Sequence, residues 1–242
     1  MIAYNVLSTK KISPSLITKA KQNNIEIIEQ EFISIKPILT KEKYEQVMPI
    51  VLNTKASNVV FTSANAVEAV KNYLHQGATW FLPNWNIFCF SGKTKNSLNP
   101  NIKESQIIAT AENASALAQK IIEHNAKEIV FFCGNKRRDE LPEILKRAGI
   151  KLEEIVVYET VETPVISTKV FDGILFFSPS SIKSFFSVNQ LNKNVVCFAI
   201  GKTTAEALKE YTDNKVIISE YPGEEMMLAT VNFYFKNINC YE

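Results

Sequence analysis

Short apolar runs alternate with stretches of helical spacing along nearly the whole chain. The short runs favour strands because they contain many β-branched and aromatic residues and are bounded by turn residues. The pattern predicts strands over 2–7, 25–30, 59–61, 87–90, 107–108, 128–133, 152–160, 174–177, 195–199 and 216–218. It predicts helices over 14–22, 42–52, 64–76, 93–98, 114–124, 139–148, 180–186, 204–211 and 224–235. Such alternation indicates the α/β class, with parallel sheets and helices on both faces.

Two extended segments, at 32–37 and 157–165, interrupt this alternation. They bracket a block of about 120 residues, which is a plausible size for a domain. We therefore expect two similar α/β domains, one inserted into the other. Residues 1–33 and 166–242 would form the first, and residues 38–162 the second. Segments 32–37 and 157–165 would form a two-stranded linker. The alternative is a single continuous sheet.

A short pattern occurs once in each predicted domain. An apolar run ends at Thr62-Ser63 and a helical stretch follows, and a similar run ends before Ser178-Pro179-Ser180. In each domain the next apolar run ends at Gly-Lys-Thr, at residues 92–94 and 201–203. Open α/β sheets bind ligands at the carboxyl ends of their strands. The repetition therefore favours a ligand bound by these turns.

The Gly-Lys-Thr tripeptide does not indicate a nucleotide triphosphatase. A phosphate-binding P-loop needs another glycine five positions earlier, where this chain has Ile87 and Val196. A simpler interpretation of each copy is a tight turn, with glycine for the bend and threonine as the helix cap. Two copies in matching contexts favour a shared ligand over two unrelated turns.

Composition excludes several classes of protein. The 242 residues are 46% apolar, but the apolar runs are far shorter than the ~20 residues that cross a bilayer. The N-terminal residues lack the pattern of a signal peptide. The four cysteines, Cys89, Cys133, Cys197 and Cys240, are far apart, which predicts reduced thiols in the cytoplasm. Two isolated histidines do not favour a zinc site, and a net charge of +2 does not favour nucleic acid.

One stretch carries a family pattern. A strand ends at Cys133-Gly134-Asn135, basic residues 136–138 follow, then Leu141, Leu145, Gly149 and Val156-Val157-Tyr158-Glu159-Thr160. With Thr62-Ser63, Ser178-Pro179-Ser180 and Gly201-Lys202-Thr203-Thr204 in the same order, the chain resembles the uroporphyrinogen-III synthase family. The resemblance implies two α/β domains joined by a two-stranded linker. The chain departs at Lys10, where the family often has arginine, at Lys202, where it often has proline, and at 221–225, before the last helix.

The resemblance also implies the chemistry. The family converts hydroxymethylbilane, a linear tetrapyrrole with eight carboxylates, by removing the terminal hydroxyl as water, inverting ring D and closing the macrocycle. It needs no metal and no redox cofactor. Tyr158 matches the proposed general acid of the family, because a phenol can donate a proton to the leaving hydroxyl. As an alternative, Tyr158 is an amphipathic residue of a β-linker with no role in catalysis.

Carboxylate binding needs donors, which helix starts supply through backbone N–H groups and the helix dipole. The expected substrate-binding residues are Thr62, Ser63, Thr94, Gly134, Asn135, Ser178, Ser180, Lys202, Thr203 and Thr204. Further cations nearby are Lys10, Lys93, Lys136, Arg137 and Arg138. Several hydroxyls would serve only as helix caps. We expect a monomer, and the alternative function is a non-catalytic two-lobed module that binds a small polyanion.

Overall fold

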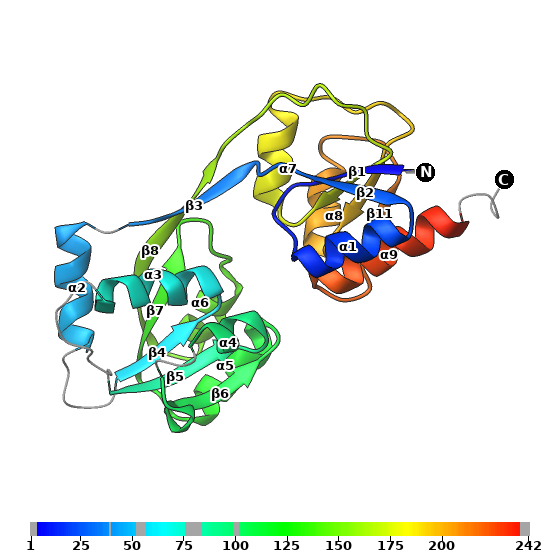
Figure 1. The fold of residues 1–242 in the computed structure, drawn as a ribbon. Coiled ribbons are helices and arrows are strands. Elements are labelled where there is room, and N and C mark those ends of the chain that lie inside the picture. Colours follow the sequence, from blue (N-terminus) through cyan, green and yellow to red (C-terminus); the bar gives the residue numbers. More distant parts are fainter. Residues whose placement is uncertain (1–3, 39, 52–56, 76–83, 99–101, 238–242) are drawn as a thin grey trace. The chain divides into compact units, whose positions relative to one another are not determined.

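The structure is a computed structural model that describes residues 4–38, 40–51, 57–75, 84–98 and 102–237. The chain divides into two compact units (Figure 1). Unit 1 comprises Met1–Ser34 and Val161–Glu242, and unit 2 comprises Ile35–Thr160. The α/β class predicted from the sequence is confirmed. Cys240 and residues 2, 3, 52 and 76, at the ends of three predicted elements, lie outside the described residues.

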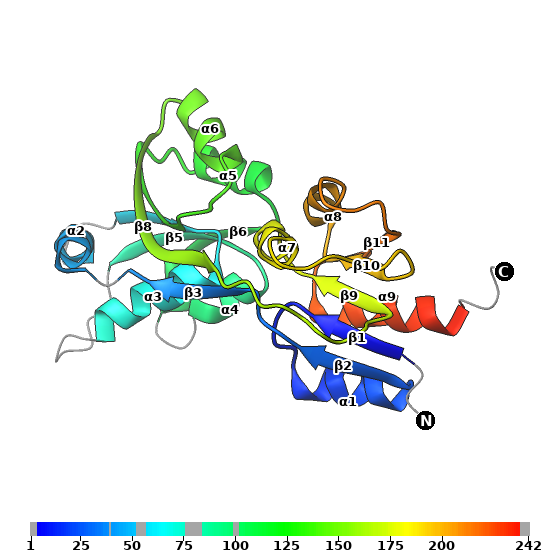
Figure 2. The same ribbon diagram turned by 90° about the horizontal axis from the view of Figure 1, so that it is seen from above.

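Unit 1 is built on a five-stranded sheet in the order β11-β10-β9-β1-β2, in which all paired strands are parallel. Its strands are β1 (Tyr4–Ser8), β2 (Ile25–Glu29), β9 (Gly173–Phe176), β10 (Val196–Ala199) and β11 (Val216–Ile218). Its helices are α1 (Pro14–Gln22), α7 (Pro179–Phe186), α8 (Lys202–Leu208) and α9 (Glu224–Asn237). Figure 2 shows α7 and α8 on one face and α1 on the other. Apolar residues of α7 and α8 form one core, and those of α1 and α9 form a second.

Unit 2 contains most of a six-stranded sheet in the order β3-β8-β7-β4-β5-β6. Its strands are β3 (Ile33–Pro37), β4 (Ser57–Phe61), β5 (Trp85–Phe90), β6 (Ile107–Ala111), β7 (Glu128–Gly134) and β8 (Lys151–Glu162). Its helices are α2 (Lys41–Val51), α3 (Ala64–His75), α4 (Lys93–Leu98), α5 (Ala114–Glu123) and α6 (Glu140–Arg147), with a 3-10 turn at Glu104–Gln106. Figure 2 shows α3 and α4 on one face of this sheet and α5 and α6 on the other. Side chains of α3 and α4 belong to one core, and those of α5 and α6 belong to a second.

Strands β3 and β8 are the two segments that connect the units, and they are neighbours in the sheet. In unit 2, the Ile38 N–H donates to the Val157 carbonyl over 2.9 Å. In unit 1, the Thr163 N–H donates to the Phe32 carbonyl over 2.9 Å. The two bonds show that the segments run in opposite directions. Pro37 ends β3, as expected of a residue without an N–H to donate.

The strand order reverses once in each sheet. In unit 1 the chain moves from β1 to β2 on one side and continues through β9, β10 and β11 on the other. In unit 2 it moves from β4 through β5 to β6, and β7 then pairs on the other side of β4. Loops on the two sides of such a reversal diverge and leave a crevice at the carboxyl ends of the strands. The repeated turns of the sequence follow β4 and β9, next to these reversals.

The predicted role of threonine in the two Gly-Lys-Thr copies is wrong. Helix α4 begins at Lys93 and α8 at Lys202, so Thr94 and Thr203 lie inside the first turn and are not N-caps. Gly92 has a φ of 68°, in the left-handed region that favours glycine, so the first copy does use its glycine for the bend. Gly201 has an extended φ of 177°, which any residue can adopt. The two copies therefore differ in backbone conformation.

Candidate active site

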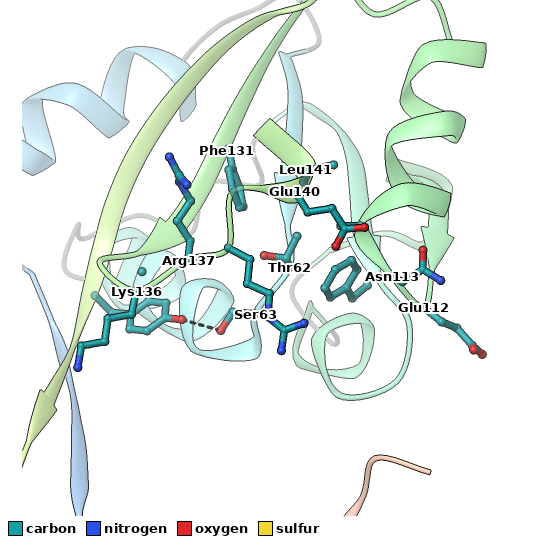
Figure 3. A pocket seen from close by; sticks show the side chains of 14 residues that line it. Thr62, Ser63, Glu112, Asn113, Phe131, Lys136, Arg137, Glu140 and Leu141 are labelled. Carbon is teal, nitrogen blue, oxygen red and sulfur yellow. Dashed lines mark hydrogen bonds between the residues drawn. The ribbon is translucent and has the colours of Figure 1, made fainter. Parts of the chain in front are cut away.

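A pocket of about 360 Å³ opens at the carboxyl edge of the sheet of unit 2 (Figure 3). The loops after β4 and β6, the end of β5, the turn after β7 and the middle of β8 contribute to it. Its lining residues are Thr62, Ser63, Phe90, Glu112, Asn113, Ala114, Phe131, Gly134, Lys136, Arg137, Arg138, Glu140, Leu141 and Tyr158. The reversal of strand order between β4 and β7 therefore coincides with a real cavity.

Tyr158 lies on β8, half-buried, with its hydroxyl at the pocket. The Tyr158 hydroxyl donates a hydrogen bond to Ser63 Oγ over 3.1 Å, drawn as the dashed line in Figure 3. Ser63 Oγ also accepts from the backbone N–H of Asn65 over 3.2 Å, at the start of α3. A serine hydroxyl that accepts two hydrogen bonds still has its own proton to donate. Ser63 can thus cap the helix, orient Tyr158 and contact a ligand with the same atom.

Gly134 and Asn135 hold Tyr158 in place. A Cβ on Gly134 would lie 2.4 Å from Cζ of the Tyr158 ring, so the ring occupies the space that any other side chain would need. The Asn135 N–H donates to the Tyr158 carbonyl over 3.2 Å, and Asn135 Oδ1 accepts from the Thr160 N–H over 2.9 Å. Gly134 and the side chain of Asn135 therefore position β8. The contacts of these two residues differ from the substrate-binding role expected from the sequence.

The basic run that follows Asn135 divides into residues with different partners. The Arg137 guanidinium forms ion pairs with Glu154 and Asp139, and its Nη2 donates to Glu154 Oε1 over 2.9 Å. The hydrogen bonds to Glu154, more than those to Asp139, raise the pKa of Arg137. Arg138 is exposed and lines the pocket. Arg137 thus anchors the β7–α6 turn to β8, while Arg138 is placed to meet an anion.

Sequence reasoning missed about half of the pocket wall. Glu112 and Asn113 follow β6, Phe90 ends β5 and Glu140 begins α6. Asn113 Oδ1 accepts from the Ala116 N–H over 2.9 Å, so Asn113 caps α5. The signal that these residues share a site is their place at the ends of neighbouring strands. Recognising it requires the strand order.

The expected binding residues of unit 1 lie at the carboxyl ends of β9 and β10. Ser178 caps α7, because its Oγ accepts from the Ser181 N–H over 3.2 Å. Ser180 is half-buried in the first turn of that helix, and Lys202 and Thr203 are exposed in the first turn of α8. Thr204 is buried with 4% of its surface exposed. The structure thus leaves Ser180, Lys202 and Thr203 accessible, and Ser178 in part.

Thr94 is a second buried threonine of the expected set. It is 6% exposed inside α4 and does not line the pocket of unit 2. Both lie inside the first turn of their helices, Thr94 as the second residue of α4 and Thr204 as the third residue of α8. Their side chains therefore turn toward the interior. A substrate contact through either hydroxyl is not supported.

Among the described residues, no group of three or more His, Cys, Asp or Glu side chains is arranged to hold a metal ion. No described helix combines the length and the apolar character needed to cross a membrane.

Comparison with known proteins decides the family. The family model for uroporphyrinogen-III synthase HemD matches residues 14–229, nearly the whole described chain. This chain belongs to the uroporphyrinogen-III synthase family. The resemblance inferred from the ordered motifs is therefore confirmed.

Individual members of the uroporphyrinogen-III synthase family are distant in sequence. A 150-residue stretch is 27% identical to uroporphyrinogen-III synthase of Saccharomyces cerevisiae and covers 51% of this chain. It covers 54% of the yeast protein, so the match spans about half the length of that curated relative.

Solved structures of the same family resemble the chain over nearly its full length. Uroporphyrinogen-III synthetase of Helicobacter pylori 26695 has a TM-score of 0.67 at 19% identity, over 95% of this chain and 98% of that one. A mutant uroporphyrinogen III synthase of the extremely thermophilic bacterium Thermus thermophilus has a TM-score of 0.64 at 12% identity, over 98% and 100%. At these identities the likeness establishes the fold alone.

Proposed function

We propose that this protein is a uroporphyrinogen-III synthase, a carbon–oxygen lyase that cyclises hydroxymethylbilane. The proposal rests on the position of Tyr158. Its phenol is held by a hydrogen bond to Ser63 at the wall of the pocket, at the carboxyl edge of the sheet of unit 2. Family membership supports the same reaction. The substrate loses its terminal hydroxyl and one proton as water, and the resulting carbon electrophile is attacked by ring D, which is inverted as the macrocycle closes.

In this proposal Tyr158 protonates the leaving hydroxyl. A phenol keeps its proton at neutral pH and can donate it, although it is a weak acid and contributes a modest factor. The pyrrole nitrogen supplies the electron pair that expels the hydroxyl, so the largest task of the protein is to fold the substrate for inversion. Ser63 and Gly134 contribute to proton donation indirectly, because they fix the direction of the Tyr158 hydroxyl.

Binding is proposed to rest on many weak contacts with the substrate carboxylates. Arg138 and Lys136 line the pocket as cations, and Thr62 and Ser63 stand at the start of α3. Ser180, Lys202 and Thr203 offer similar groups on unit 1. The reaction leaves the oxidation state of the substrate unchanged, so we expect no redox cofactor and no metal. We also propose a monomer. The buried thiols of Cys89, Cys133 and Cys197 support a cytoplasmic location.

The decisive experiment is an isomer assay. The protein is mixed with hydroxymethylbilane, the product is oxidised to porphyrin, and the type III and type I isomers are separated by chromatography. We expect type III to dominate, whereas heat-denatured protein should give the type I isomer of uncatalysed closure. A type I product at the uncatalysed rate would contradict the proposal and favour the alternative, a two-lobed binding module for a polyanion.

A further inference from the structure

In unit 1, the carboxylate of Glu224 occupies a small anion-binding arrangement. Glu224 is the first residue of α9, and its Oε1 lies 2.6 Å from Lys10 Nζ. Its Oε2 accepts a hydrogen bond from the Ser13 N–H over 3.2 Å. The Lys10 and Glu224 side chains are 33% and 28% exposed, so both remain open to exchange with solvent. One cation and one backbone N–H thus converge on a single carboxylate.

This arrangement lies next to the reversal of strand order in unit 1. Lys10 follows β1, and its Nζ lies 4.6 Å from the centre of the Phe177 ring, which follows β9. The backbone just before Lys10 is fixed, because the Thr9 N–H donates to the Leu175 carbonyl over 3.1 Å. The Lys10 ammonium is therefore placed over the position where an open α/β sheet binds its ligand. The carboxylate of Glu224, a residue of the same chain, occupies the position beside this ammonium.

We propose that Lys10 and the Ser13 N–H form a carboxylate subsite for the substrate, and that Glu224 is an internal placeholder which a substrate carboxylate displaces. The proposal rests on the proposed function, since it assigns one of the eight substrate carboxylates to unit 1. Exchange of one carboxylate for another keeps the same donors satisfied. Releasing a partly exposed ion pair costs little, because such pairs contribute only a few tenths to about 1 kcal/mol.

The placeholder has a consequence for selectivity. A simple anion must displace Glu224 with no other contact to offset the lost ion pair. A polycarboxylate makes further contacts elsewhere, so the same loss is a small part of its total binding energy. Glu224 thus favours ligands with several carboxylates over single anions. It also keeps Lys10 paired when no substrate is present.

The test compares Glu224→Gln with Glu225→Gln, which removes the same charge from the next residue of the helix. Uroporphyrin III, an unreactive ring with eight carboxylates, is titrated against each variant by fluorescence, and kcat and KM for hydroxymethylbilane are measured. For Glu224→Gln we expect about two- to five-fold tighter binding of uroporphyrin and a KM lower by the same factor, with kcat unchanged. Glu225→Gln should bind uroporphyrin like the wild type.

Two more variants test the cation and guard against misfolding. Lys10→Gln should weaken uroporphyrin binding, while Lys11→Gln, on the exposed neighbouring side chain, should have little effect. Glu224→Asp keeps an acid in the first turn of α9 but shortens its reach to Lys10, so it should also tighten binding. This variant decides the question if Glu224→Gln does not fold.

The proposal is overturned if Glu224→Gln and Glu225→Gln bind uroporphyrin equally, or if loss of Glu224 weakens binding. Either result would make the ion pair a purely structural link between α9 and the loop after β1. If the wild type forms no type III isomer while Glu224→Gln still binds uroporphyrin more tightly than Glu225→Gln, the proposed function fails and the subsite stands.

Discussion

Gly134 and the ring of Tyr158 lie in direct contact, so close that a Cβ at position 134 would fall 2.4 Å from Cζ of the ring. The contact occurs where the register between β7 and β8 shifts, between Cys133 and Gly134. The shift brings Gly134 opposite Tyr158. The absence of a side chain at position 134 therefore decides where the phenol lies. Gly134 is a positioning residue for the proposed acid.

Gly134→Ala should reduce turnover more than substrate affinity. The added methyl group must displace the Tyr158 ring, which moves the hydroxyl away from Ser63. Overpacking of this kind also costs about 1–3 kcal/mol of unfolding free energy. Steady-state kinetics and thermal unfolding measure the two effects. Gly201→Ala, where a Cβ meets no atom within 4 Å, serves as the packing control and should lose less stability than Gly134→Ala, because only the N-cap preference of α8 is affected. A Gly134→Ala enzyme with normal kcat would contradict the positioning role.

Tyr158→Phe should lower kcat by about one to two orders of magnitude and leave substrate affinity nearly unchanged. The variant removes the proposed proton donor and keeps the ring that packs against the core of unit 2. Ser63→Ala is the matched variant, because it removes the acceptor of the same 3.1 Å hydrogen bond but keeps the phenol. It should lower kcat less than Tyr158→Phe. If Tyr158→Phe turns over at the wild-type rate, Tyr158 is not the acid.

The sequence was informative about the fold and about half of the pocket. Alternating strands and helices were enough to predict the α/β class, and two extended segments led to the prediction of nested units. Thr62, Ser63, Gly134 and Tyr158 were also singled out, and they meet in one pocket. They could be found because each directly follows or belongs to an apolar strand.

The remaining parts of the site depend on tertiary structure. Glu112 joins the pocket because β6 lies beyond β5 in the sheet, an order that periodicity along the chain does not reveal. Thr94 and Thr204 were assigned to substrate because they stand near helix starts, but successive residues of a helix point about 100° apart, and these two side chains face the interior. Asn135 was assigned to substrate, but its amide forms a hydrogen bond with β8. Such local hydrogen bonds cannot be distinguished from ligand contacts by residue type.

The neighbouring arginines should respond to substitution in opposite ways. Arg137→Gln breaks the ion pairs to Glu154 and Asp139 and should lower the free energy of unfolding by about 1–2 kcal/mol. Arg138→Gln should leave stability nearly unchanged and weaken binding of uroporphyrin, because this exposed cation lines the pocket. Chemical unfolding and fluorescence titration of both variants measure the contrast. Equal loss of affinity without any loss of stability in Arg137→Gln would contradict the anchoring role.

Burial of Cys197 should make part of the stability sensitive to alkaline pH. Burial raises the pKa of the Cys197 thiol from 9.0 to about 12 in the folded protein. The folded chain then keeps a proton that the unfolded chain loses, so the contribution is complete below pH 9 and declines as the pH rises toward 12. Relative to Cys197→Ala, the wild type should lose about 1 kcal/mol between about pH 8 and about pH 10. Urea unfolding measures this difference, and parallel pH profiles would contradict it.

Substitution of two hydroxyl residues of unit 1, Ser178 and Thr203, distinguishes the effect of helix capping from that of substrate binding. Ser178 caps α7, so Ser178→Ala should cost about 1 kcal/mol of unfolding free energy with or without ligand. Thr203 is exposed and is not a cap, so Thr203→Ala should change stability by less than about 0.5 kcal/mol. Each substitution should also weaken substrate binding by about 0.5–1.5 kcal/mol, the usual contribution of one neutral hydrogen bond.

Neither hydroxyl should be essential for turnover, because eight carboxylates share the binding energy among many donors. The measurement is KM for hydroxymethylbilane at a temperature where both variants are folded, beside a thermal unfolding curve of each. Loss of all turnover in folded Ser178→Ala would show that one contact of unit 1 controls the chemistry. If Tyr158→Phe also turned over at the wild-type rate, the proton donor would have to be sought near Ser178, and the assignment of Tyr158 on unit 2 would be wrong even if the reaction is the one proposed.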